Sequence, residues 1–218
     1  MKISNKAKKI LITAGPVWVP IDSVRVITNI FTGTLGFLIA QEAARRGFKV
    51  TLLLGPGSVA IPKRISKNLE IIRFHFFDQL YQEMEKRVKS GNYKVLFHTA
   101  AVADYLPCKK YDGKIKSGQA NLSISFKPTV KIIDMVKVWD PDILLIKFKL
   151  EAGLSKNELI AKAYESMLHS RAEIIVANDL SEMGGGGHKA YIVDRAKNIK
   201  VCNGKHNIAQ NLIELIEK

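Results

Sequence analysis

The feature that most constrains this chain is a regular alternation of apolar, strand-like runs with amphipathic, helix-like segments. The first run, 9–14, is followed by a segment over 34–46 in which leucine, isoleucine and alanine recur every three to four residues. Strands that alternate with helices in this way build a mostly parallel sheet covered by helices on both faces. The pattern therefore predicts an α/β fold, a Rossmann-like doubly wound sheet.

The same alternation continues to the end of the chain. Gly47 closes the first predicted helix in the position of a C-terminal capping glycine. Two runs near the C-terminus, 189–194 and 198–202, predict a β-hairpin that precedes a last helix. We predict further strands over 50–54, 69–76, 94–101, 142–150 and 173–177, and further helices over 79–89, 130–138, 156–170 and 208–216.

Composition limits the class of protein. With 218 residues, of which 47% are hydrophobic, the chain can bury one layered core, and we expect a single domain over residues 1–218. No apolar run approaches the length that spans a membrane, and Cys108 and Cys202 lack the close spacing of a disulfide framework or a zinc site. We therefore expect a cytoplasmic protein that does not bind a membrane.

The net charge of +14 indicates attraction to molecules that carry phosphate groups. The basic residues are scattered along the chain, however, and lack the interleaved aromatic side chains of an RNA-binding surface. We expect no nucleic-acid partner. The expected partners are small phosphorylated molecules.

In a doubly wound sheet the ligand lies beyond the carboxyl ends of the strands, so the loops that follow strands are where we look for a site. The loop over 15–33 is far longer than the tight turn of a dinucleotide fold, and Gly33 and Gly36 stand where the next helix begins. A helix start offers backbone N–H groups and a positive dipole to an anion. The glycines are equally typical of a close contact between helix and strand, and both interpretations stay open.

A second unusual loop follows the predicted strand over 94–101. Its alanines allow a base or ribose to approach the backbone, and Asp104 can accept hydrogen bonds from sugar hydroxyls or hold Mg²⁺. Lys114 lies in a polar segment, 104–118, that we interpret as a mobile loop, from which a lysine can close over phosphates. The alternative interpretation is that Asp104 is a turn residue and that the lysines keep the loop soluble.

A series of short strings, in order across nearly the whole chain, resembles phosphopantothenoylcysteine synthetase, the ligase of coenzyme A biosynthesis. No flavin-dependent decarboxylase segment precedes them, so we expect a stand-alone form of the ligase. The strings are Ile-Thr-Ala-Gly, Pro-Ile-Asp-x-Val-Arg-x-Ile-Thr-Asn, Gly-x-x-Gly, Arg-Arg-Gly, Ala-Ala-Val-Ala-Asp-Tyr, Lys-Ile-Lys, Lys-Pro-Thr, Phe-Lys-Leu-Glu and Val-Ala-Asn-Asp.

The resemblance implies an amide-forming reaction in two steps. The carboxylate of 4′-phosphopantothenate attacks the α-phosphate of CTP or ATP, and cysteine then displaces the nucleotide monophosphate. This order is chemically sensible because a free carboxylate is a poor electrophile, whereas an acyl-nucleotide carries a good leaving group. The resemblance further implies Mg²⁺ as a cofactor and a homodimer.

The resemblance also assigns roles to residues. Asn29 is implied to be catalytic by steadying the acyl-nucleotide, and Lys114 by contacting the triphosphate and closing the site. Arg25, Asn29 and Ala101 are implied to bind the substrates, with Arg25 acting across a dimer interface. Asp104 is implied to hold Mg²⁺ through the nucleotide phosphates. The implied nucleotide-binding residues are Gly15, Gly33, Ala100, Asp104, Lys114, Pro128, Thr129, Val130 and Phe148.

The chain departs from the family pattern in the helix that precedes residues 176–179. Many family members carry lysines there, whereas this chain has Ser166 and Ser170, so part of the usual phosphate-neutralising charge is missing. The candidates to compensate for it are Lys147, Lys149, His169 and Arg171.

Two other functions stay open. A NAD(P)- or flavin-dependent oxidoreductase shares the fold, but the first strand is not followed by Gly-x-Gly-x-x-Gly and no acidic residue ends the second strand at Leu54 and Gly55. A non-catalytic nucleotide-binding paralogue would keep the fold and lose the activity. The sequence does not distinguish CTP from ATP.

Overall fold

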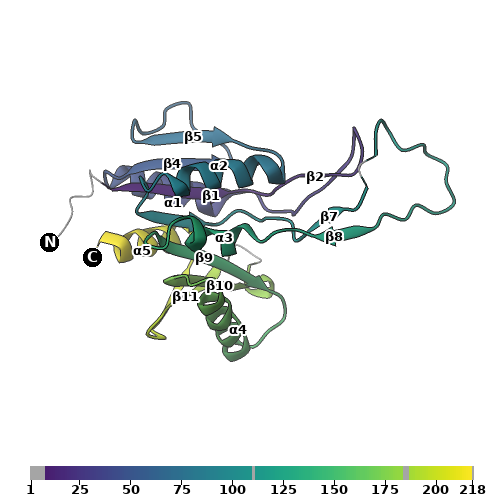
Figure 1. Cartoon of the computed structure of the whole chain (residues 1–218). Coiled ribbons are helices and arrows are strands. Elements are labelled where there is room, and N and C mark those ends of the chain that lie inside the picture. Colours follow the sequence, from purple (N-terminus) through teal and green to yellow (C-terminus); the bar gives the residue numbers. More distant parts are fainter. Residues whose placement is uncertain (1–7, 110, 184–186, 218) are drawn as a thin grey trace.

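The centre of the protein is an eight-stranded sheet, seen in a computed structural model that describes residues 8–109, 111–183 and 187–217 (Figure 1). Six neighbouring strands are parallel and the last two are antiparallel. In spatial order they are β5 (Leu69–Arg73), β4 (Lys49–Leu54), β1 (Lys9–Ala14), β6 (Val95–His98), β9 (Leu144–Glu151), β10 (Ile174–Asp179), β11 (Lys189–Asp194) and β12 (Ile199–Asn203).

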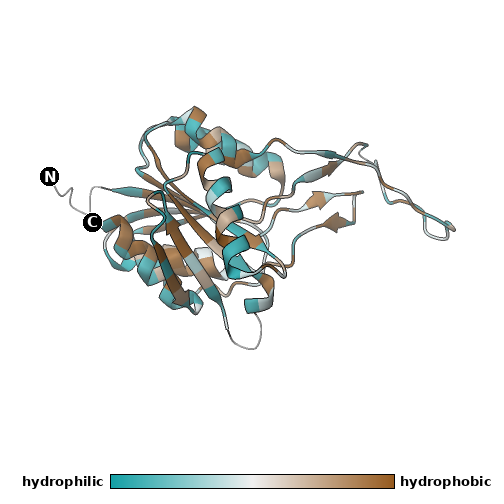
Figure 2. Cartoon of the chain, turned by 90° about the horizontal axis from the view of Figure 1, so that it is seen from below, coloured by the Kyte–Doolittle hydropathy of each residue, from teal (hydrophilic) through white to brown (hydrophobic). Residues whose placement is uncertain are grey.

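Helices cover both faces of this sheet. Along β1, Ile10 and Ile12 pack against one group of helices while Leu11, between them, packs against the other. The strands are therefore apolar on both sides, as Figure 2 shows in brown, which is typical of a parallel sheet. No helix among the described residues is long and apolar enough to cross a membrane. One face carries α1 (Thr34–Arg45) and α5 (Lys205–Glu217), and the other carries α2 (Phe77–Lys89), α3 (Ile132–Trp139) and α4 (Lys156–His169).

The direction of winding reverses between β1 and β6. From β1 the chain passes through α1 to β4 and β5, at one edge, whereas from β6 it passes through α3 to β9 and then through α4 to β10. The loops that follow β1 and β6 therefore diverge, and ligands of such sheets bind in the crevice between them. The predicted doubly wound α/β fold with a C-terminal hairpin is confirmed; the single-domain organisation of residues 1–218 stays a prediction.

Two short hairpins extend away from the carboxyl end of the sheet and form an arm (Figure 1). The arm comprises 19–27 and the described residues of 105–128. The segment 104–118, predicted to be a mobile loop, has a short strand at its start, because residues 105–107 pair with residues 126–128, which local patterning does not reveal. The pairs are β2 (Val19–Pro20) with β3 (Val26–Ile27), and β7 (Tyr105–Pro107) with β8 (Phe126–Pro128).

β6 is shorter than the predicted strand over 94–101. It ends at His98, because Thr99 and Ala100 turn toward β1: Thr99 Oγ1 donates to the Thr13 carbonyl at 2.7 Å, and Ala100 N donates to Thr13 Oγ1 at 3.2 Å. The two alanines singled out in the sequence, Ala100 and Ala101, consequently lie in the loop at the switch point of the sheet.

Candidate active site

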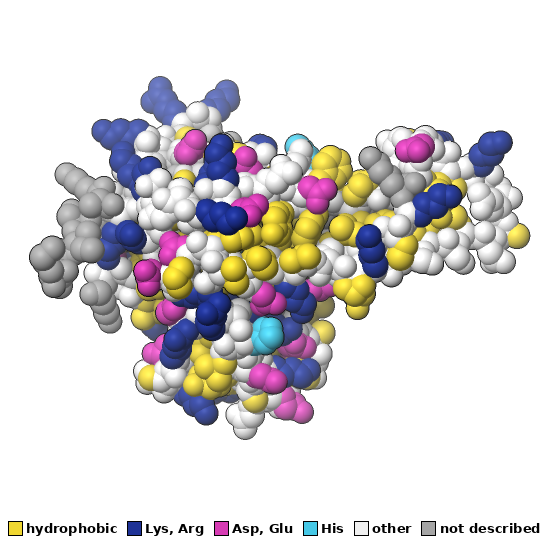
Figure 3. All heavy atoms as spheres, viewed as in Figure 1, with side chains coloured by type: hydrophobic (Ala, Val, Ile, Leu, Met, Phe, Trp, Pro, Cys, Tyr) yellow, Lys and Arg dark blue, Asp and Glu magenta, His cyan; other side chains and the backbone are white. Residues whose placement is uncertain are grey.

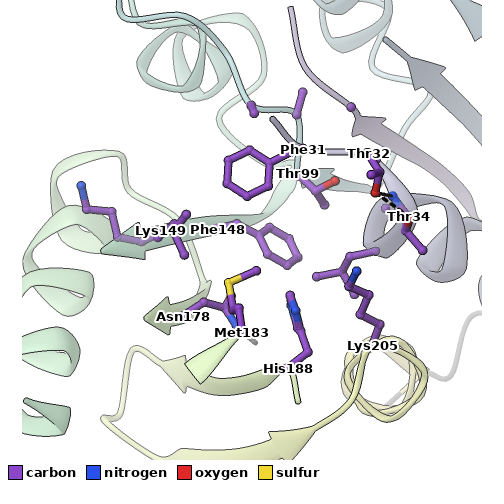
Figure 4. A pocket seen from close by; sticks show the side chains of 17 residues that line it. Phe31, Thr32, Thr34, Thr99, Phe148, Lys149, Asn178, Met183, His188 and Lys205 are labelled. Carbon is purple, nitrogen blue, oxygen red and sulfur yellow. Dashed lines mark hydrogen bonds between the residues drawn. The ribbon is translucent and has the colours of Figure 1, made fainter. Parts of the chain in front are cut away.

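A cavity of about 200 Å³ opens beside the loops that follow β1 and β6, and we call it the glycine cavity (Figure 4). Gly33 and Gly36 place the start of α1 on its wall. Gly33 has a φ of 82°, which favours glycine, and a Cβ on Gly36 would collide with the side chains of Thr99 and Ala14. The close contact between helix and strand is thus present, and it also brings the positive end of the helix dipole to the cavity.

The opposite wall of the glycine cavity comes from β9 and from the segments around β11 and α5. Phe148 and Met183 give it apolar surface, while His188 and Lys205 supply nitrogen atoms (Figure 4). Burial lowers the pKa of His188, and the ammonium of Lys205 adds to this effect, so the imidazole is neutral at pH 7. Lys205 is therefore the cation that this wall presents. The Lys149 side chain points away and pairs with Glu151 at 3.1 Å.

A second cavity, of about 220 Å³, shares part of its wall with the first. We call it the lysine cavity, because Lys131, Lys147 and Lys149 line it, whereas Asp104 is the one carboxylate among its described lining residues. Ala100, Phe148 and Lys149 line both cavities. The two cavities therefore adjoin along these three residues, at the carboxyl end of the sheet.

Three polar side chains lie in register beside the lysine cavity. Thr13, His98 and Lys147 are neighbours on β1, β6 and β9. Thr13 Oγ1 lies 2.9 Å from His98 Nδ1. Burial lowers the pKa of His98 to about 4, and the charge of Lys147 acts in the same direction. His98 is therefore neutral at physiological pH, and Lys147 is the charged member of the row.

Lys147 contacts both serines that replace the lysines of the family pattern. Its Nζ donates to Ser166 Oγ at 2.9 Å and to Ser170 Oγ at 3.1 Å. Burial lowers its pKa to about 8; Lys149 and Lys131 also lower it, and Asp134 opposes them. Of the four candidates to compensate for the missing charge, Lys147 is the one for which the structure shows hydrogen bonds to these serines.

Asn29 lies at a third cavity, of about 480 Å³, at the root of the arm. This arm cavity is lined by Asn29 and Asp104 together with mainly apolar residues. Asn29 Nδ2 donates to the Ala101 carbonyl at 3.2 Å, which fixes the amide beside the loop after β6. Asp104 also lines the lysine cavity. The structure thus brings together three of the predicted residues, Asn29, Ala101 and Asp104.

The segment after β8 closes one side of the lysine cavity. Thr129 N donates to the Asp104 carbonyl and Thr129 Oγ1 donates to the Ala103 carbonyl, each at 2.9 Å. These bonds hold Thr129 and Val130 on the cavity wall. Pro128, the third predicted residue of this segment, is exposed at the end of β8 and lines none of the three cavities.

Arg25 and Lys114 lie on the arm and line none of the three cavities. The buried Asp22 carboxylate joins their segments: it accepts hydrogen bonds from the backbone N–H groups of Val24, Arg25 and Ile115, and from the Arg25 guanidinium at 3.1 Å. These bonds, the Val24 N–H foremost, lower the pKa of Asp22. The predicted convergence of Lys114 with Asn29 and Asp104 is not formed in this structure and stays a prediction.

The single carboxylate among the described residues of the site, Asp104, suits a metal ion that arrives with a substrate. Over the described ranges, no group of three or more His, Cys, Asp or Glu residues is placed to hold a metal ion. Mg²⁺ is commonly held by one or two carboxylates together with the phosphates of a nucleotide. The lysine cavity fits that arrangement, because Asp104 would be the one protein carboxylate on the ion and the nucleotide phosphates would supply its other ligands.

Sequence reasoning missed four basic side chains that line these cavities: His98, Lys131, His188 and Lys205. His98 is a polar residue in an otherwise apolar strand, and Lys131 directly follows the predicted Val130. The sequence around each of them could therefore have identified it as a candidate site residue. The sequence around His188 and Lys205 gives no such indication, because these residues lie at the glycine cavity only as a result of the strand order in the folded sheet.

Comparison with known proteins identifies relatives of this chain. The pattern that defines the DNA/pantothenate metabolism flavoprotein C-terminal domain matches residues 5–218. The coenzyme A biosynthesis bifunctional protein CoaBC of Thermococcus kodakarensis is 36% identical over 217 residues, which cover 99% of this chain and 52% of that protein. The chain therefore spans about half the length of the curated relatives it matches.

Two solved structures share the fold over nearly their whole length. The DNA/pantothenate metabolism flavoprotein from Streptococcus pneumoniae is 32% identical with a TM-score of 0.88, and the match covers 97% of this chain and 99% of that one. The C-terminal domain of a CoaBC protein is 26% identical with a TM-score of 0.79, covering 99% and 97%.

Proposed function

Because the chain belongs to the family of DNA/pantothenate metabolism flavoprotein C-terminal domains, we propose that it joins 4′-phosphopantothenate to cysteine in coenzyme A biosynthesis. Its similarity to coenzyme A biosynthesis proteins supports this proposal. The observation that carries it is the pair of adjoining cavities at the switch point of the sheet. They offer separate places for two phosphorylated molecules whose reactive ends have to meet.

The negative charge of each substrate, compared with the cations that line each cavity, indicates which cavity it binds. A nucleoside triphosphate carries most of the negative charge, and the lysine cavity presents Lys131, Lys147 and Lys149 to it. The single phosphate of 4′-phosphopantothenate suits the start of α1 and Lys205 in the glycine cavity. In this arrangement Gly15 and Gly33 contact phosphopantothenate, which changes the sequence-based expectation that they bind the nucleotide.

The reaction then needs a group that steadies the acyl-nucleotide where the cavities meet. A carboxylate oxygen attacks the α-phosphorus and the bond to pyrophosphate breaks; the cysteine amine next attacks the acyl carbon, loses a proton and releases the nucleotide monophosphate. Asn29 lies at the arm cavity, and its Nδ2 donates one hydrogen to Ala101, which lines the glycine cavity; its second N–H is therefore available to donate to the acyl-nucleotide. Such a donor contributes about 3 kcal/mol to catalysis. Mg²⁺, bound by the phosphates and Asp104, would neutralise phosphate charge.

The arm suits a homodimer in which Arg25 acts at the site of the partner. Apolar side chains on the arm are exposed, Val24 by 67% and Tyr105 by 58%, and so is Ile30 beside it, which directly follows Asn29, by 89%. Figure 3 shows hydrophobic side chains gathered along the base of the arm. Exposed apolar surface of this kind marks an interaction site. Light scattering should give the mass of a dimer, and mixing inactive Arg25→Ala and Asn29→Ala proteins should restore activity by forming one intact site in the mixed dimer.

One assay tests the proposed reaction. The protein is incubated with 4′-phosphopantothenate, cysteine, Mg²⁺ and either CTP or ATP, and pyrophosphate release is measured. We expect release with at least one nucleotide, strictly dependent on 4′-phosphopantothenate. No turnover with either nucleotide would favour a non-catalytic paralogue, and consumption of NAD(P)H would favour an oxidoreductase.

A further inference from the structure

Lys147 is a buried cation without an acidic partner. Only 7% of its surface is exposed, and it forms no ion pair with any described carboxylate. Its three hydrogens go to neutral acceptors: the Ser166 carbonyl at 3.0 Å, and the hydroxyls of Ser166 and Ser170. Lys137 is equally buried, yet it pairs with Glu173 at 2.8 Å. Buried lysines are normally paired, because removing their charge from water is costly.

The groups that face Lys147 do not neutralise it. His98 on β6 is uncharged, and Lys131 and Lys149 carry the same sign as Lys147. Asp134 on α3 is the carboxylate that favours the charged form, but it also lies 3.6 Å from His169 on α4. Lys147 therefore retains uncompensated positive charge on the wall of the lysine cavity.

Ser166 adds a hydrogen-bond donor next to this charge. Ser170 Oγ donates back to the carbonyls of its own helix, at 3.1 Å to Ser166 and 3.3 Å to Met167. Ser166 lines the lysine cavity, and its Oγ accepts from Lys147, which leaves its hydroxyl hydrogen for a ligand. A charge and a donor side by side suit a phosphate oxygen.

We propose that the charge of Lys147, held in place by Ser166 and Ser170, stabilises the polyphosphate group of the nucleoside triphosphate in the lysine cavity, while the Ser166 hydroxyl donates to a phosphate oxygen. This inference rests on the proposed function and names the cation that serves it. A polyphosphate fits better than a single carboxylate, because three lysines line the cavity and Asp104 is available to a divalent cation on the phosphates.

The proposal has a consequence for pH dependence. The pKa of Lys147 is lowered to about 8 in the free protein, and a bound polyanion raises it again. Binding is therefore strongest below pH 8 and weakens as the pH rises above it, because the neutral amine has to take up a proton. Between pH 7 and pH 9 this group alone should weaken binding about tenfold.

Calorimetric titration with inorganic tripolyphosphate, and with CTP and ATP in the presence of Mg²⁺, tests the proposal. Lys147→Met keeps the length of the side chain and removes the charge; we expect it to weaken binding about tenfold or more at pH 7 and to lose the additional weakening up to pH 9. Lys200→Met, which removes an exposed charge on the distant strand β12, is the matched control and should bind as the wild type does.

Two further variants keep the test decisive. Lys147→Arg retains the charge and stays protonated at pH 9, so its binding should not follow the wild-type pH dependence. Ser166→Ala should weaken binding less than Lys147→Met and keep the pH dependence. Thermal unfolding of each variant separates loss of binding from loss of the fold, and Lys147→Met should be no less stable than the wild type, because it removes an unpaired buried charge.

Two results would overturn the inference in distinguishable ways. If Lys147→Met binds tripolyphosphate as tightly as the wild type, with the same pH dependence, the role of Lys147 is wrong and the proposed ligase is untouched. If the wild type binds neither nucleotide nor tripolyphosphate, the inference and the proposed function both fail.

Discussion

Gly36→Ala tests how closely α1 approaches the strands beneath the glycine cavity. Two effects oppose each other. Alanine is the better helix former by about 1 kcal/mol, so the substitution would stabilise an unrestrained helix. The new Cβ, however, would overlap Thr99 Oγ1, which is held by its bond to Thr13, and the Cβ of Ala14 on β1. Overpacking of this kind costs about 1–3 kcal/mol, so we expect a net destabilisation of about 1 kcal/mol and a fall in Tm of about 2–4 °C.

The matched control for Gly36→Ala is Gly47→Ala, at the other end of the same helix. Gly47 has a φ of 93° but open space around it, so alanine there should cost about 1 kcal/mol through backbone strain alone. Calorimetry should therefore give similar losses of stability for both variants, while only Gly36→Ala weakens binding of 4′-phosphopantothenate. A Gly36→Ala protein that is more stable than the wild type and binds equally well would refute the close approach.

Three other predictions concern single side chains. Asn29→Ala should slow pyrophosphate release about 100-fold or more while circular dichroism stays unchanged, because the exposed amide donates to the loop after β6 and not to the core; an unfolded variant would contradict its assigned role. Two arginines lower the pKa of Glu42 to about 2, so Glu42→Gln should be less stable at pH 7, with the gap closing as the pH falls from about 4.5 toward 2 in an acid titration; a gap independent of pH would count against that pairing. Maleimide at pH 8 should label exposed Cys108 and spare Cys202, whose pKa is raised by burial; mass spectrometry showing equal labelling would disprove the packing of β12.

The sequence was sufficient for the layers and for part of the site. The apolar runs and helical spacings predicted the sheet and its helices, because burial on both faces of a parallel sheet leaves a direct pattern. Asn29, Ala101 and Asp104 were predicted and lie together, since each follows or faces the end of a central strand.

What the sequence could not predict depends on contacts between distant segments. The arm strands are only two or three residues long, and pairing of Tyr105–Pro107 with Phe126–Pro128 has no local signature. Lys205 reaches the glycine cavity because α5 packs beside α1, which becomes visible only once the topology is known. The importance of Lys147 follows from its burial without an ion pair to any described carboxylate, which its residue type does not reveal: Lys137 is equally buried but pairs with Glu173.

The proposed function depends on the activation of a carboxylate by its transfer to a nucleotide between the two cavities. The most direct test uses 4′-phosphopantothenate labelled with oxygen-18 in its carboxylate, under the conditions that release pyrophosphate, followed by mass spectrometry of the products. The carboxylate oxygen that attacks the α-phosphorus should leave with the nucleotide, so we expect one labelled oxygen in the nucleotide monophosphate. A nucleotide monophosphate without the label would contradict it.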